Sequence, residues 1–409
     1  MRRALGALAL GTVLGTLATP AIAVVPSVTW VRTAGIVLRS VVVARDGAVY
    51  VVGDRRSSIT RKGFVAKFSP DGDLKWRRSF LPSVQASTTG VAVDLLPDGR
   101  IVWVGAVQGQ CEGGGWFVEV RGPTGRLRHR FVTPGWRCSI AQQVTDVAGG
   151  PDGIVVTGFD HGCCGDASSD GWVRAFDRLA RPRWRVNVEP PPPTPRGWWD
   201  RATGVAIARG GDAFVAGWAA AEPVRPGEEA PFVRGSAILA RLGEGGALRW
   251  VRRIDEAPMR GQDAVVQIAV GGGVVAVTAA VDGSGVAWRL GGRASSGWLG
   301  RFGLGGALAW SRRWDAIRPK AAEPAGVVID GARRIWVVGT RRDLADRGLD
   351  LALRRFTAAG SPIDQVRLEG ARWVRGTGIA AQGASAFVTG YLGRSPWEAN
   401  GGRLWRLAA

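Results

Sequence analysis

The string Gly72-Asp-Leu-Lys-Trp76 recurs along the chain and decides the fold. Clear copies are Gly246-Ala-Leu-Arg-Trp250 and Gly306-Ala-Leu-Ala-Trp310. Degenerate copies are Gly125-Arg-Leu-Arg-His129, Ala180-Arg-Pro-Arg-Trp184 and Gly360-Ser-Pro-Ile-Asp364. Self-similarity at an interval of tens of residues is the sequence signature of a repeat architecture.

Two further strings recur with the same interval. In one, apolar residues precede a glycine, at Gly53, Gly105, Gly158, Gly217, Gly339 and Gly390, and a seventh copy, Val274–Ala279, lacks the glycine. The other alternates apolar residues and ends at a basic-apolar pair, although its second and third copies lack the basic residue. The copies are Gly63–Phe68, Gly115–Val120, Gly171–Phe176, Ala237–Leu242, Gly297–Phe302, Leu351–Phe356 and Gly402–Leu407. Its basic positions are Lys67, Arg241, Arg301, Arg355 and Arg406, for which we expect ion pairs between neighbouring repeats.

Each repeat reads as four strands, with apolar residues at every second position and turns such as Pro97-Asp-Gly99. Radial packing of such units protects their edges. We therefore predict an all-β fold, a seven-bladed β-propeller of four-stranded antiparallel blades. The blades are expected at about 35–82, 87–133, 141–188, 200–254, 262–314, 322–369 and 374–409, and residues 24–34 supply the missing fourth strand of the last blade.

The repeats resemble those of the bacterial secreted seven-bladed propeller families, often called SBBP repeats. Units of those families join a V-x-V-x-G strand, an aromatic strand ending in K/R-F and a G-x-L-x-W strand. The tryptophan-bearing strand is also similar to the tryptophan-docking repeat of quinoprotein propellers. Both resemblances imply the fold, and neither implies an activity, because propellers host unrelated functions.

The N-terminal residues 1–23 have the pattern of a cleavable signal peptide. Arg2 and Arg3 precede an apolar run, and Ala21-Ile22-Ala23 forms a small-residue cleavage site. We expect an exported protein, periplasmic or extracellular, with one propeller domain over 24–409, no transmembrane span and a monomeric state. A retained signal anchor is the alternative.

The chain is strongly basic, with a formal net charge of +20. Loss of Arg2 and Arg3 would lower this charge to +18. Such a field favours anionic partners. Nucleic acid is disfavoured because the basic residues are spread along the chain and the signal directs the protein away from the genome. An acidic protein or an anionic envelope or extracellular polymer fits better.

Long insertions gather on one face of the predicted propeller, formed by the loops between second and third strands and by the connections between blades. Function is expected there, since loops carry binding and catalytic residues. All four cysteines map to this face: Cys111, Cys138, Cys163 and Cys164. An even number of cysteines in an exported chain predicts two disulfides, in any of three connectivities.

The candidate binding residues on this loop face are of two kinds. Some are tryptophans and arginines, and the others belong to a loop in which a histidine lies between two aspartates. They are Trp136, Arg137, Asp160, His161, Asp166, Trp198, Trp199, Arg201, Trp288, Arg289 and Trp397. Tryptophan and arginine are enriched at binding hot spots. No catalytic residue can be named, the usual zinc spacing is absent, and no cofactor or metal is predicted.

Two functions are consistent with these features. The first is an exported, non-catalytic binding propeller that presents its basic face to an acidic protein or anionic polysaccharide. The alternative is a propeller enzyme that acts on carbohydrate, or a quinone-cofactor oxidoreductase, for which the acidic loops and the Cys163-Cys164 pair are the motivation.

Overall fold

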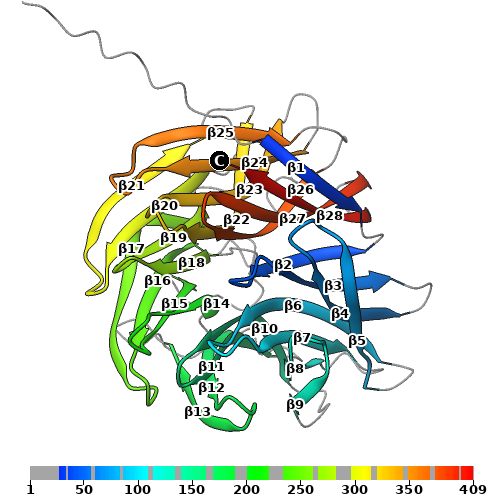
Figure 1. Ribbon diagram of the computed structural model, residues 1–409. Coiled ribbons are helices and arrows are strands. Elements are labelled where there is room, and N and C mark those ends of the chain that lie inside the picture. The colour runs from blue at the N-terminus through cyan, green and yellow to red at the C-terminus, as the bar shows by residue number, and fades with distance from the viewer. Residues whose placement is uncertain are drawn as a thin grey trace, which may run out of the picture.

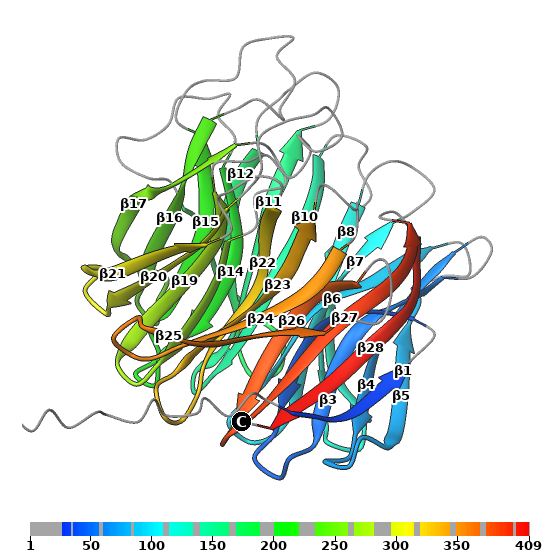
Figure 2. The same cartoon turned by 90° about the horizontal axis from the view of Figure 1, so that it is seen from above.

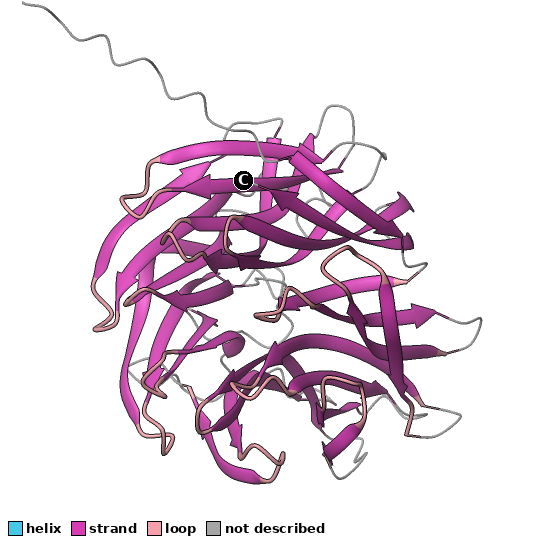
Figure 3. Ribbon diagram, in the orientation of Figure 1, coloured by secondary structure: helices cyan, strands magenta, loops and turns pink. Residues whose placement is uncertain are grey.

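Seven antiparallel sheets of four strands are arranged in a ring (Figure 1), as described by a computed structural model. The structure describes residues 27–33, 36–56, 60–82, 86–108, 114–133, 140–162, 169–188, 200–220, 234–260, 266–281, 296–314, 320–343, 349–368, 374–395 and 398–408. Within these ranges every regular element is a strand (Figure 3). The predicted all-β, seven-bladed fold is confirmed.

Each blade contributes one strand to the middle of the ring and one to its circumference. Blades 1 to 4 are β2 (Val37–Val43), β3 (Val49–Arg56), β4 (Arg61–Phe68) and β5 (Leu74–Phe80); β6 (Ser87–Leu95), β7 (Ile101–Gln108), β8 (Gly114–Arg121) and β9 (Leu127–Val132); β10 (Ile140–Gly150), β11 (Gly153–Gly162), β12 (Ser169–Phe176) and β13 (Pro182–Asn187); β14 (Asp200–Ile207), β15 (Ala213–Ala220), β16 (Arg234–Leu242) and β17 (Leu248–Arg260). Blades 5 to 7 are β18 (Val266–Gly271), β19 (Val274–Val281), β20 (Ser296–Gly303) and β21 (Leu308–Trp314); β22 (Lys320–Ile329), β23 (Ile335–Asp343), β24 (Leu349–Phe356) and β25 (Pro362–Leu368); β26 (Val374–Gln382), β27 (Ser385–Ser395), β28 (Glu398–Ala408) and β1 (Ser27–Thr33).

The second strand of each blade is more apolar than simple alternation predicts. Every residue of β15 is buried, and so are Val49 to Val52 of β3. A blade packs between two neighbours, so its central strands are covered on both faces and carry continuous apolar runs. The outermost strands, with one face or both in solvent, keep polar residues at most positions, as in Leu74 to Ser79 of β5.

Where the repeated string keeps its tryptophan, this side chain joins the outermost strand to the next blade. Trp76 of blade 1 donates its indole N–H to the Pro123 carbonyl of blade 2 at 3.1 Å. A Cβ added to Gly125, which has φ of 81°, would lie 2.9 Å from the Trp76 ring. The same pairing recurs for Trp184 with Gly246, Trp250 with Gly306 and Trp310 with Gly360.

The degenerate copies fit this arrangement. His129 takes the place of the tryptophan in blade 2, and the matching position of blade 3 is Ala180, which adopts the left-handed conformation with φ of 56°. Asp364 takes the place of the tryptophan in blade 6. In blade 7, which follows blade 6, the third and fourth strands are β28 and β1. They come from opposite ends of the chain and no turn connects them, so there is no turn glycine for an indole of blade 6 to contact.

The strand β1 lies antiparallel to β28, on the outside of the last blade (Figures 1 and 2). Trp30 is paired with Arg406, as Trp76 is paired with Lys67 in blade 1. The register therefore gives Trp30 the place of the docking tryptophan. That this strand holds the ring closed stays a prediction.

The expected ion pairs between blades are wrong for two of the repeated basic residues. Arg241 pairs with Asp212, and Arg355 pairs with Asp364, each within its own blade. Contact with the next blade is a hydrogen bond to a neutral carbonyl: Arg241 donates to Leu304 at 3.1 Å and Arg406 donates to Pro70 at 3.2 Å. The turn of the next blade presents main-chain oxygens there, so a carbonyl is the available acceptor.

Candidate functional site

Most predicted loop-face residues lie outside the described part of the chain. They are Trp136, Arg137, Asp166, Trp198, Trp199, Trp288, Arg289 and Trp397, with Cys111, Cys138, Cys163 and Cys164, and residues 1–23 lie outside it too. For these positions the binding, disulfide and signal-peptide hypotheses stay predictions.

Three of the predicted residues fall on described strands of blades 3 and 4. Asp160 forms an ion pair with Arg185 at 2.6 Å. The guanidinium carbon of Arg201 lies 4.3 Å from the centre of the Phe159 ring. His161 is paired in the backbone ladder with Ala141 and Ser169. The structure thus brings Asp160, His161 and Arg201 to the same end of two adjacent blades.

The outermost strands carry basic residues in every blade. These strands lie around the circumference of the ring (Figure 1), so basic residues that are spread along the sequence form rows there. The rows consist of Arg32, Lys75, Arg77, Arg78, Arg128, Arg130, Arg183, Arg185, Arg249, Arg252, Arg253, Arg260, Arg312, Arg313 and Arg367. Acids on the same strands are Asp255, Glu256 and Asp364.

Some of these cations form an ion pair with a carboxylate among the described residues, and others donate hydrogen bonds to neutral carbonyls. Arg130 pairs with the buried Glu119, and Arg185 pairs with Asp160. By contrast, Arg252 donates to the Gly306 carbonyl at 3.0 Å and Arg312 to the Gly360 carbonyl at 2.9 Å. A carbonyl has no net charge, so these guanidinium groups stay cationic toward solvent.

The need to prevent association through exposed strand edges explains why these strands carry charged residues. It does not explain why most of the charges are positive. Outermost strands have an unpaired backbone edge, and charged side chains prevent edge-to-edge association. Glutamate or aspartate would serve equally well there. The excess of one sign produces a positive field around the ring, which attracts anions.

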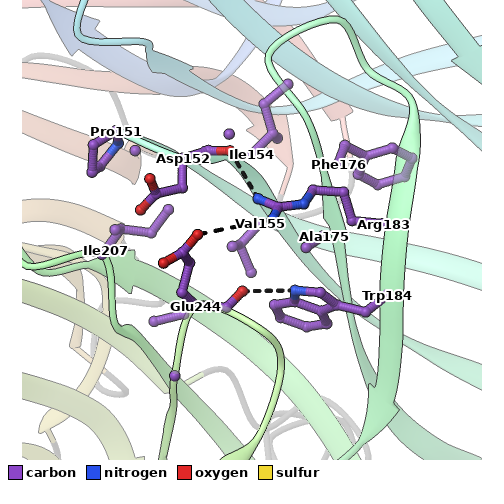
Figure 4. Close-up of a pocket in the computed structure, with 15 residues that line it drawn as sticks. Pro151, Asp152, Ile154, Val155, Ala175, Phe176, Arg183, Trp184, Ile207 and Glu244 are labelled. Carbon is purple, nitrogen blue, oxygen red and sulfur yellow. Dashed lines mark hydrogen bonds and ion pairs between the residues drawn. The ribbon is translucent and has the colours of Figure 1, made fainter.

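A hollow opens between blades 3 and 4, with an empty volume of about 330 Å³ that includes open solvent (Figure 4). It lies where Ala175 occupies the repeated basic position of β12, paired with Trp184. Arg183 from the outermost strand reaches into this space and donates to the Asp152 carbonyl at 3.1 Å. Its guanidinium lies 3.9 Å from the Glu244 carboxylate. The chain therefore supplies its own cation at this hollow.

Two aspartates lie on the innermost strands, where sequence reasoning placed no site. Asp146 accepts hydrogen bonds from the Val147 amide at 2.8 Å and from the Val205 amide of the next blade at 2.9 Å. Asp94 accepts from the Gly149 amide of the next blade at 2.8 Å. Each carboxylate thereby satisfies an amide on the unpaired edge of an innermost strand.

Burial raises the pKa of both aspartates, because a charged carboxylate is disfavoured away from water. The pKa of Asp146 rises to about 7, and the negative charge of Asp94 contributes to this rise. The pKa of Asp94 rises to about 6. Backbone hydrogen bonds oppose the shift in both cases. The signal in the sequence was an acid inside an apolar run, as in Val91-Ala-Val-Asp-Leu95.

Two other kinds of feature are absent from the described ranges. No group of three or more His, Cys, Asp or Glu side chains there could hold a metal ion. No helix long and apolar enough to cross a membrane occurs among the residues whose structure is described.

Comparison with known proteins yields similar folds only. No family model and no curated protein matches the chain. A solved puromycin hydrolase variant is 14% identical with a TM-score of 0.51, over 88% of this chain and 50% of that one. At this identity the likeness shows the fold alone.

Two other solved structures are similar at lower scores. A Hadza microbial sialidase is 11% identical with a TM-score of 0.44, over 91% of this chain and 65% of its own. A protein of unknown function from Dyadobacter fermentans is 10% identical with a TM-score of 0.48, over 94% and 98%. The chain spans half of the hydrolase and just under two thirds of the sialidase.

Proposed function

We propose that the chain is an exported, non-catalytic binding propeller whose basic surface holds an anionic polysaccharide or an acidic protein. The observation that supports this proposal is the excess of basic over acidic residues on the outermost strands. The basic residues recur at regular intervals from blade to blade, which favours a linear polyanion because its charges also repeat. The Trp/Arg residues of the loop face are proposed to add specificity to this attraction.

The geometry of blades 1, 2 and 4 offers matched positions for a test. Lys75, Arg128 and Arg249 each stand between the leucine and the tryptophan or histidine of the repeated string, and all three are exposed. The triple variant Lys75→Gln, Arg128→Gln, Arg249→Gln removes three charges from the rows without touching a docking tryptophan. Its control, Arg45→Gln, Arg209→Gln, Arg333→Gln, removes three exposed charges from turns of inner hairpins.

Binding would be measured by titration calorimetry with alginate, polyglutamate and neutral dextran. We expect the outer-strand variant to bind alginate about tenfold more weakly than the control at low salt, because rim charges act through long-range attraction. Binding should weaken from about 50 to 500 mM salt, where the Debye length shrinks several-fold. Equal loss in both variants, or salt-insensitive binding, would contradict the proposal, and a preference for polyglutamate would favour the acidic protein.

The family and the compartment belong to the same proposal. We propose an SBBP-type repeat protein, cleaved after Ala23 and located in the periplasm or outside the cell, with its four cysteines in two disulfides. Intact mass measurement of the exported protein, before and after reduction, tests the cleavage site and the disulfides. A mature chain that begins at Val24 and gains four hydrogens on reduction is the expected result.

A further inference from the structure

A second hollow lies between blades 5 and 6 and contains a buried cation. Its empty volume is about 240 Å³, including open solvent, and its walls include Trp314, Glu323, Thr340, Arg341 and Arg354. Arg341 is only 5% exposed. An arginine side chain stays protonated in proteins, so this position holds a positive charge away from water.

Arg341 has no hydrogen-bond or ion-pair partner in the described part of the chain, although Glu323 is on the wall of the same hollow. The Arg341 Nε atom is buried without a hydrogen-bond partner there. The ion pairs formed by the described residues do not include Arg341, although Asp350 is its cross-strand neighbour and Glu323 shares the hollow. A buried charge with no partner is strongly destabilising.

Comparison of the blades shows that the position is not intrinsically polar. Arg341 stands two residues after the strand glycine, Gly339. The corresponding residues Val107, Ala219 and Val281 in blades 2, 4 and 5 are apolar and buried. In blade 3 the corresponding residue is Asp160, which has Arg185 as its partner. Blade 1 also has a cation there, Arg55, but that side chain is exposed. Blade 6 therefore differs in burying a charge at this position without a partner.

We infer that this hollow binds a carboxylate carried by a small hydroxylated body, the chemistry of a sugar acid. A carboxylate matches the planar fork of a guanidinium, with two parallel hydrogen bonds. Arg354 lines the same hollow, and its guanidinium carbon lies 5.4 Å from the centre of the Trp314 ring. Arg341 supplies the positive charge, and Trp314 supplies an apolar wall.

Glu323 narrows the choice of anion. Its charge on the wall of the hollow repels divalent anions more than monovalent ones, since the Coulomb energy scales with the charge. Its oxygens can also accept hydrogen bonds from hydroxyl groups. A monocarboxylate with hydroxyls is thus favoured over sulfate or phosphate.

The test is a titration of the full chain with methyl glucuronide, methyl glucoside and sulfate. We expect glucuronide to bind and the neutral glucoside not to bind. Arg341→Met should lose glucuronide binding, and Arg341→Lys should weaken it about tenfold, because lysine keeps the charge but loses the bidentate fork. Arg209→Met, which removes an exposed charge outside the hollow, should leave binding within about twofold.

Thermal unfolding separates a binding role from a structural one. Because the corresponding positions of blades 2, 4 and 5 are apolar, Arg341→Met should melt no lower than the parent without ligand, and glucuronide should raise the melting temperature of the parent alone. Unchanged binding in Arg341→Met, equal binding of sulfate, or a ligand-independent loss of stability would overturn the inference. Lys75, Arg128 and Arg249 do not line this hollow, so its failure is distinct from failure of the outer-strand proposal.

Discussion

At the scale of single residues, tryptophan and glycine act as a pair that joins neighbouring blades. Gly246 has φ of 83°, and a Cβ there would lie 2.7 Å from the Trp184 ring. Gly99 has a similar φ of 80° but nothing within 4 Å of such a Cβ. Alanine at either position would strain the backbone, but only alanine at Gly246 would also collide with the indole. Comparing the two substitutions therefore distinguishes the two effects.

We expect Gly246→Ala to destabilise the protein more than Gly99→Ala does. Left-handed strain is common to both and costs about 1 kcal/mol. The collision with Trp184 is additional, and Trp184→His should relieve it, because blade 3 already has Ala180 at the place that corresponds to Gly246, opposite His129. A double-mutant cycle by urea denaturation measures the coupling, and strictly additive effects would contradict the account.

The residue scale also includes a pH effect at Asp146. Its pKa is about 7 in the folded protein against 3.8 in the unfolded chain. Between these values the folded state keeps a proton that the unfolded state releases, so this group lowers stability as the pH rises through the window. Asp146 accepts a hydrogen bond from the Val205 amide of the next blade. Ser40 takes its place in blade 1, where the serine hydroxyl accepts a hydrogen bond from the Val93 amide of the next blade.

Asp146→Ser should therefore raise the melting temperature at pH 8 relative to the parent, and the gain should vanish near pH 4. Asp98→Ser is a control of opposite sign. Side-chain hydrogen bonding to Arg100 lowers the pKa of Asp98 below its ordinary value of 3.8, so its contribution is present at pH 8 and is lost only as the pH falls below that value. The measurement is the melting temperature of each variant, relative to the parent, as a function of pH. If this difference changed with pH in the same direction for both variants, the raised pKa of Asp146 would be contradicted.

At the scale of the strands, the repeated glycine follows from a bulge in the innermost strand. A Cβ on Gly217 would lie 2.1 Å from the Arg201 carbonyl oxygen, and the register of β14 shifts just beyond, between Ala202 and Gly204. Blade 5 has Ala279 in place of the glycine, and its two strands pair without a shift. The copy that looks degenerate in the sequence thus marks the blade whose inner pair lacks the bulge.

The strands and their order could be predicted from the sequence because the three strings fix the strand type, the turns and the repeat number. Candidate sites could not be predicted in the same way. Arg341 is one basic residue among many in the sequence, and its lack of a partner depends on contacts between blades 5 and 6. Asp94 and Asp146 similarly acquire their role from the amides of the next blade.

At the scale of the whole molecule, we predict that contacts between the two ends of the chain hold the ring closed. The first strand, β1, pairs with β28 from Ser27 with Ala408 to Thr33 with Arg403. Without it, β28 would become an open edge in the last blade. The docking series would also lose Trp30, whose register matches that of Trp76.

The central claim is that residues 24–33 close the propeller, and thermal unfolding of a chain lacking them tests it most directly. We expect a lower melting temperature for the whole domain, because loss of the strand exposes the edge of the last blade, and recovery when a synthetic peptide of residues 24–34 is added. A truncated protein that melts like the parent, with no response to the peptide, would contradict the closed ring.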